Sequence, residues 1–162
     1  MKKRLFVIII FIAIVSFFSW CFFWRPKTIL FLCIHNTFRS QMTEAYFNKF
    51  AKEKGIKWQA KSAGFLEAEK INEKAIILMK EEGIDISQNK PKLVNEKMIK
   101  RADKIVVVCA ECEEQGLCVV LPQDKDIEYW RLPNPAEMEL AQAREIRNKI
   151  KENVLTLIEE LK

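Results

Sequence analysis

Apolar runs alternate with helical patterns along the chain after residue 26. Lys27–Cys33 is short, apolar and β-branched, the pattern of a buried parallel strand, and Lys104–Cys109 is the clearest second example. Two weaker strands are predicted at residues 57–63 and 119–121. Strands that alternate with helices predict an α/β domain with a four-stranded parallel sheet, flanked by helices and joined by right-handed crossovers.

Three stretches between these strands carry apolar residues at helical spacing. The first helix is predicted to begin at Ser40 and to stop at Gly55. Asn72 has the pattern of an N-cap for the second helix, which is predicted to end at Gly83. A further helix is predicted over residues 93–102.

The first 24 residues differ from the rest, because residues 5–24 form a run of 20 residues without a charge. A helix of that length spans roughly 30 Å, enough to cross the hydrocarbon core of a bilayer. Three cations precede the run and aromatic residues end it, as is typical of membrane segments. We expect a single-pass anchor over residues 1–24 and an α/β domain over residues 25–162; a cleaved signal peptide and a wrongly extended start are the alternatives.

The charge balance gives no case for a nucleic-acid partner. Of the 27 cationic residues, three lie in the leader, which leaves 24 against 22 acidic residues. The leading cations weakly favour a domain outside the membrane, whereas the thiol chemistry described below favours a reducing compartment. The side of the membrane therefore stays open.

The first strand ends in a segment that suits anion binding. A cysteine and an arginine bracket five residues whose N–H groups can surround a tetrahedral anion, and a helix begins at once. Arg39 would clamp two oxygens, while Cys33 would act as a nucleophilic thiolate that the Ser40 hydroxyl stabilises. The bland alternative is a buried structural cysteine near a surface arginine. The predicted oxyanion-binding residues are Ile34, His35, Asn36, Thr37, Phe38, Arg39 and Ser40.

Three segments resemble the low-molecular-weight tyrosine phosphatase superfamily, namely residues 28–45, the turn at 62–64 and residues 82–87. The similarity covers essentially the whole chain after Arg25. Phosphatases of this family have proline after the Arg-Ser pair, but here Gln41 follows. This continuation, together with the His-Asn pair of the loop, resembles thioredoxin-coupled arsenate reductases. The resemblance implies an oxyanion substrate (arsenate or a phosphate ester), a thioredoxin-like reductant and no cofactor.

The reductase branch needs more than one thiol, because reducing arsenate to arsenite takes two electrons. By the resemblance, Cys109 fits the thiol that attacks Cys33, and Cys118 fits the thiol that carries the disulfide outward. Cys112 can take either role. Structural packing and a zinc site are the alternatives, but a fourth zinc ligand is not apparent, and we predict no metal.

The family places a general-acid aspartate before a proline late in the chain, and here that position holds Asn134. An amide cannot transfer a proton at neutral pH, so Asp124 or Asp126 would have to substitute. Asn134 has the pattern of an N-cap, with Pro135 opening one long amphipathic helix and Glu137 completing the cap.

Three functions remain in view. The first is reduction of arsenate by a cysteine relay, and the second is hydrolysis of phosphotyrosine or another aryl phosphate through a cysteinyl-phosphate intermediate. The third is non-catalytic binding of an oxyanion or phosphopeptide. Phe38 replaces a small residue of the family, and we expect it either to narrow the pocket or to line its rim.

Overall fold

The computed structural model describes residues 26–162. Its centre is one four-stranded sheet with the strand order β2-β1-β3-β4, and each neighbouring pair is parallel. The predicted four-stranded parallel sheet is therefore confirmed. The strands are β1 (Lys27–Cys33), β2 (Trp58–Gly64), β3 (Lys104–Cys109) and β4 (Ile127–Leu132).

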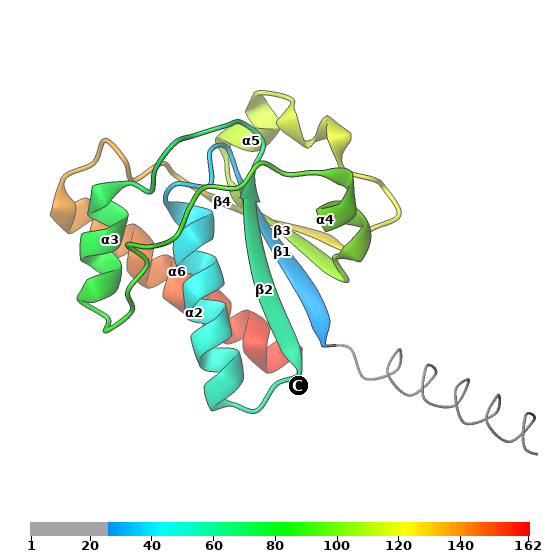
Figure 1. The fold of residues 1–162 in the computed structure, drawn as a ribbon, viewed down its shortest axis with the longest axis horizontal. Coiled ribbons are helices and arrows are strands. Elements are labelled where there is room, and N and C mark those ends of the chain that lie inside the picture. The colour runs from blue at the N-terminus through cyan, green and yellow to red at the C-terminus, as the bar shows by residue number, and fades with distance from the viewer. Residues whose placement is uncertain (1–25) are drawn as a thin grey trace, which may run out of the picture.

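Helices cover the sheet and one of its ends. In Figure 1, α2, α3 and α6 lie on one side of the sheet and α4 on the other, with α5 at the end where the strands finish. Helix α2 packs against α6, β1 and β2, and α4 packs against β1. The helices are α2 (Arg39–Glu53), α3 (Glu73–Lys80), α4 (Glu96–Arg101), α5 (Glu111–Glu114), a 3₁₀ helix η1 (Leu117–Val120) and α6 (Leu140–Glu160).

The two central strands form the middle of the core. Strand β1 is buried from Ile29 to Cys33, and β3 from Ile105 to Cys109. Strands covered on both faces need apolar residues at every position, which explains the unbroken apolar runs in the sequence. Burial of these strands fixes the sheet and, with it, the position of the residues that follow each strand.

The prediction of a strand at residues 119–121 is wrong. Most of it belongs to the 3₁₀ helix η1, and Val119 and Val120 are 85% and 60% exposed. The fourth strand is β4, an edge strand that stays half-exposed along most of its length and carries charged residues. An edge strand does not need a continuous apolar run, so β4 lacks the pattern that predicts a buried strand.

The predicted start of the last helix is also wrong. Helix α6 begins at Leu140 behind a capping box formed by Glu139 and Gln142, and not at Pro135 behind Asn134. The Lys74 ammonium donates to the carbonyls of Ala136 and Met138, which holds the preceding segment outside the helix. The predicted Asn72 cap is confirmed, since its side chain accepts from the Lys74 N–H of α3.

The predicted membrane anchor over residues 1–24 lies outside the described residues. Between residues 26 and 162, the structure contains no helix with the length and apolar character needed to span a membrane.

Candidate functional site

The site lies where β1 passes into α2. Cys33 ends β1, and Arg39 begins α2 after a loop of five residues. Parallel strands finish at one edge of the sheet, and open α/β sheets bind ligands there. Leu32 of β1 pairs with Val107 of β3, so Cys33 and Cys109 lie just past that pair on neighbouring strands.

Asn36 organises the loop. Its backbone has a φ of +56°, the left-handed conformation that asparagine tolerates better than most residues. Its buried side chain makes four hydrogen bonds: Nδ2 donates to Ser40 and Ser62 at 2.8 Å each, and Oδ1 accepts from Gln41 Nε2 and Lys92 N at 2.9 Å each. The amide therefore has its full set of partners, and only one orientation satisfies them.

The Cys33 sulfur faces polar hydrogens of the loop. Its Sγ lies 2.8 Å from Ser40 Oγ and accepts from the Asn36 N–H at 3.2 Å. Because Ser40 Oγ already accepts from Asn36, the Ser40 hydroxyl hydrogen is available for the sulfur. These two contacts fix the direction of the sulfur within the loop.

The hydrogen-bond network continues from Asn36 to the neighbouring strand. Ser62 of β2 accepts from Asn36 and donates to the Glu44 carboxylate, which also pairs with the Lys92 ammonium at 2.9 Å. The side-chain amide of Asn36 and the hydroxyls of Ser40 and Ser62 each have hydrogen-bond partners that fix their positions. Buried polar networks of this kind rigidify the structure around them.

Gly64 leaves room for the loop. A Cβ at this position would lie 2.7 Å from the backbone carbon of His35 and 2.8 Å from the carbonyl oxygen of Ile34. Both are backbone atoms, so neither can rotate away. The loop can pass β2 only where the strand carries glycine.

The loop presents N–H groups that have no protein partner. Within residues 26–162, no acceptor is found for the backbone N–H groups of residues 34, 35 and 37–40. Some of these groups belong to the first turn of α2, where the helix dipole favours an anion. A loop of free donors at a helix N-terminus is a ready site for a phosphate-like oxyanion.

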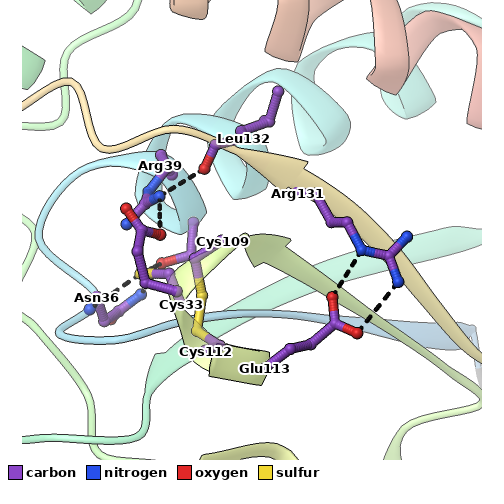
Figure 2. Close-up of a disulfide and its surroundings, with 10 residues drawn as sticks. Cys33, Asn36, Arg39, Cys109, Cys112, Glu113, Arg131 and Leu132 are labelled. Atoms are coloured by element: carbon purple, nitrogen blue, oxygen red, sulfur yellow. Dashed lines mark hydrogen bonds and ion pairs between the residues drawn. A yellow bond between two sulfur atoms is a disulfide. The ribbon is translucent and has the colours of Figure 1, made fainter. Parts of the chain in front are cut away.

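The Arg39 guanidinium is buried and already paired. The residue is 4% exposed, and its Nη1 donates to Glu111 Oε2 at 2.7 Å and to the carbonyl oxygen of Leu132 at 2.6 Å. Figure 2 shows Arg39 directed toward the carbonyl of Leu132. The Leu132 carbonyl holds the Arg39 guanidinium in place, and the Glu111 carboxylate balances its charge.

Cys109 and Cys112 are joined by a disulfide, and Cys33 and Cys118 are free. The register of β3 against β4 shifts between Val107 and Cys109, an irregularity of the kind that re-aims a side chain. Both bonded cysteines are fully buried, and Figure 2 shows the bond between them. The structure thus pairs Cys109 with Cys112 and not with Cys118. A disulfide also removes two of the thiolates that the zinc alternative needed.

Cys118 is the free thiol of the α5–η1 region, and it is only partly buried. Burial raises its pKa above the ordinary value for cysteine, and the Glu113 carboxylate raises it further. A hydrogen bond with Tyr129 offsets part of this effect. A raised pKa leaves less thiolate at neutral pH, so Cys118 is a weak candidate for a thiol that must attack a disulfide.

The remaining predicted residues fall into different places. His35 is exposed, and Phe38 is 4% exposed and packs in the apolar core. Asn134 is exposed and accepts from the Ala136 N–H at 3.2 Å. Asp126 pairs with Lys104 before β4 begins, at the opposite end of the sheet from Cys33. It is therefore not placed to substitute for a general acid at the loop.

Sequence reasoning missed Glu111, Ser62 and Gly64. Ser62 and Gly64 belong to the family pattern at residues 62–64, but that pattern does not predict their contacts with the loop. Glu111 carried one usable signal, a carboxylate between two closely spaced cysteines. Its partner is 72 residues away in the chain, so no local pattern connects the two residues.

This chain is similar in sequence to curated arsenate reductases. Arsenate reductase 2 of Staphylococcus haemolyticus is 36% identical over 125 residues, which cover 77% of this chain and 91% of that protein. Arsenate reductase 1 of Staphylococcus epidermidis is 37% identical over 132 residues, covering 82% of this chain and 96% of that protein.

Two solved structures share the fold. The arsenate reductase of Archaeoglobus fulgidus is 40% identical with a TM-score of 0.67, and the match covers 80% of this chain and 98% of that one. A low-molecular-weight protein tyrosine phosphatase from T. tengcongensis is 30% identical with a TM-score of 0.75, covering 83% and 99%.

The predicted localisation as a single-pass membrane protein is corrected by these relatives, and nothing among them supports the predicted membrane partner. The described residues contain no membrane-spanning helix. The arsenate reductases correspond over 91% and 96% of their own lengths to only 77% and 82% of this chain, so their similarity concerns the α/β domain.

The family itself is shown by its match to residues 28–162 under the description "Low molecular weight phosphotyrosine protein phosphatase". That match includes all of the sheet except its first residue, together with the anion loop and the three later cysteines. The resemblance expected from the loop sequence is confirmed, including the similarity to arsenate reductases. The chain therefore belongs to the low-molecular-weight phosphotyrosine protein phosphatase family.

Proposed function

We propose that this protein reduces arsenate to arsenite with Cys33, Cys109 and Cys112, and that a thioredoxin-like dithiol restores it. The observation that carries the proposal is the pairing of Cys109 with Cys112 beside a free Cys33. A phosphatase of this family needs one cysteine only. A reductase needs two further thiols that can form a disulfide with each other.

The chemistry begins at the loop. The N–H groups of the loop and Arg39 hold arsenate, and the Cys33 thiolate attacks arsenic while an arsenate oxygen leaves as water. This forms a bond between sulfur and As(V). The Asn36 N–H and the Ser40 hydroxyl hold the sulfur toward the anion by two hydrogen bonds.

The next two steps move electrons and sulfur. The Cys109 thiolate attacks the Cys33 sulfur, the electron pair of the S–As bond stays on arsenic, and arsenite leaves as As(III). The Cys112 thiolate then attacks Cys109 in the new Cys33–Cys109 disulfide, which releases Cys33 as a thiolate. The product is a Cys109–Cys112 disulfide with a free Cys33, the redox state of the structure.

This assignment changes one part of the expected relay. Cys112 takes the role first given to Cys118, because Cys112 is the bonded partner of Cys109 and the pKa of Cys118 is raised. Asn134 fits the proposal, since the leaving group of the first step is an arsenate oxygen. Arsenate exchanges its oxygens readily, so this step depends less on a general acid than hydrolysis of a phosphate ester does.

The decisive assay follows arsenate-dependent oxidation of reduced thioredoxin by the full chain, with arsenite measured as the product. We expect turnover in the natural protein and none in Cys33→Ser, Cys109→Ser or Cys112→Ser. Asn95→Ser, which keeps a capping hydroxyl at the start of α4, serves as the control and should keep full turnover. Undiminished turnover in Cys109→Ser would disprove the relay.

Hydrolysis of an aryl phosphate is the second candidate function. It is favoured by the family match and by the similarity to the tyrosine phosphatase of T. tengcongensis. It needs Cys33 and Arg39 but neither later cysteine, so hydrolysis that survives Cys109→Ser and Cys112→Ser would support it. Binding of phosphate without either reaction would instead support the oxyanion-binding alternative.

A further inference from the structure

One nitrogen of the oxyanion clamp, Arg39 Nη1, already pairs with a carboxylate of the same chain. Glu111 Oε2 lies 2.7 Å from Arg39 Nη1, and the two side chains are 26% and 5% exposed. A carboxylate on a guanidinium uses the same charge-assisted hydrogen bond that an arsenate or phosphate oxygen would use. Glu111 therefore stands in the position of a competitor for the substrate.

The disulfide determines where this carboxylate lies. Glu111 sits between Cys109 and Cys112, whose Cα atoms are 5.6 Å apart and only three residues apart in sequence. Helix α5 begins at Glu111, so the bond encloses Ala110 and this first residue of the helix. Closing so short a loop removes most of the freedom of the residues inside it.

We propose that Glu111 is a redox-dependent gate, which closes the oxyanion pocket in the disulfide state and opens it when Cys109 and Cys112 are thiols. The gate rests on the proposed function for its purpose. In the disulfide state, Cys109 has no thiol with which to resolve an adduct on Cys33. A closed pocket keeps arsenate away from Cys33 until the reductant has restored that thiol.

The physical reason is the competition of like charges for one cation. A bound oxyanion would lie against the Glu111 carboxylate in a site with little solvent, and juxtaposed like charges oppose binding strongly. Once the disulfide is reduced, the short segment between Cys109 and Cys112 is no longer tied at both ends, and the Glu111 carboxylate can leave Arg39. The Leu132 carbonyl still holds the guanidinium in place for the substrate.

Inorganic phosphate is a suitable probe, because it binds the same donors and is not reduced by thiols. Its dissociation constant can be measured on the full chain by the protection of Cys33 from iodoacetamide, with the alkylated residue identified by mass. The disulfide state is compared with the state reduced by dithiothreitol. We expect phosphate to bind at least about tenfold more weakly to the disulfide state.

Glu111→Gln tests the residue itself. The amide keeps the size of the side chain and removes its charge, so phosphate should bind the disulfide state of this variant nearly as tightly as the reduced state. Glu113→Gln is the matched control: Glu113 lies in the same short helix but pairs with Arg131. This variant should keep the difference between the two redox states.

Three results would overturn the gate. They are equal phosphate affinity in the two redox states, an unchanged difference in Glu111→Gln, and loss of the difference in Glu113→Gln. Cys109→Ser/Cys112→Ser guards against a folding effect, because it should bind phosphate tightly without any reductant. Since phosphate binding does not require arsenate reduction, equal affinities with intact arsenate turnover would sink only the gate. A clear difference without arsenate turnover would sink only the proposed function.

Discussion

The side-chain nitrogen of Asn36 lies 2.8 Å from Ser40 Oγ and donates a hydrogen bond to it. This contact occupies a lone pair of the hydroxyl and leaves its hydrogen for the Cys33 sulfur, 2.8 Å away. The same amide anchors Ser62 and accepts from Lys92 N. One buried side chain thus sets both the shape of the loop and the environment of the nucleophile.

Replacing Asn36 with alanine should therefore damage stability and activity together. The change leaves buried partners unsatisfied and puts alanine at a φ of +56°, at a cost of about 1–3 kcal/mol in the free energy of unfolding. Urea denaturation measures this loss. Asn134→Ala is the control, because Asn134 is exposed and makes one local hydrogen bond. A stability loss of equal size in both variants would argue against a special role for Asn36.

Gly64→Ala should displace the loop without touching its chemistry. The new Cβ would lie 2.7 Å from a backbone atom of His35, so the loop or β2 must move. We expect a lower melting temperature and at least about tenfold slower turnover, since small displacements of reacting groups cost rate steeply. Gly83→Ala is the matched control. Its φ of +70° carries strain of about 1 kcal/mol, but a Cβ there meets no atom within 4 Å. Gly83→Ala should lose stability and keep its turnover per folded molecule.

Cys112→Ser and Cys118→Ser should differ sharply in arsenate reduction. Without Cys112, the relay should stop after one arsenite per molecule and leave Cys33 joined to Cys109, as non-reducing peptide mapping can show. Cys118→Ser should turn over at about the natural rate, because Cys118 is not bonded to Cys109 in the structure. The opposite pattern, with Cys118 needed and Cys112 dispensable, would restore Cys118 to the relay.

The Cys118 thiol should react slowly with iodoacetamide at neutral pH. Burial and the Glu113 carboxylate raise its pKa, so the reactive thiolate forms only at higher pH than in an unstructured peptide. Its alkylation rate, followed by mass across a pH series, should rise late. Glu113→Gln should shift that rise toward lower pH. A rate profile that matches an unstructured cysteine would contradict this reading of the site.

Asn134→Asp should help phosphate-ester hydrolysis more than arsenate reduction. An aspartate at this family position can donate a proton to a leaving alcohol, which is typically worth about 10² to 10⁴ in rate. We expect faster hydrolysis of an aryl phosphate with a poor leaving group and little change in thioredoxin-coupled arsenate turnover. Glu137→Asp is the control. It keeps an exposed carboxylate close to Asn134 in the sequence and should have no effect on hydrolysis. If hydrolysis does not rise at all, Asn134 does not occupy the general-acid position.

Local patterns in the sequence determined the centre of the protein. The apolar runs of β1 and β3 predicted the two central strands, because a strand buried on both faces needs apolar residues throughout. The segment from Cys33 to Arg39 predicted the anion loop, since a strand end, five residues and a helix start are contiguous in the chain. The edge strand β4 and the start of α6 escaped prediction, because their boundaries depend on contacts with other elements.

Only the tertiary structure decided how the site is assembled. Three contacts of the site join segments that are distant in the sequence or that could have paired in several ways. They are the Cys109–Cys112 disulfide, the ion pair of Arg39 with Glu111, and the hydrogen bond from Lys92 N to Asn36. Spacing along a chain limits which residues can meet, but packing of the sheet and helices selects among them. The Arg39–Glu111 pair spans 72 residues, and it forms because parallel strands bring their carboxyl ends to one edge.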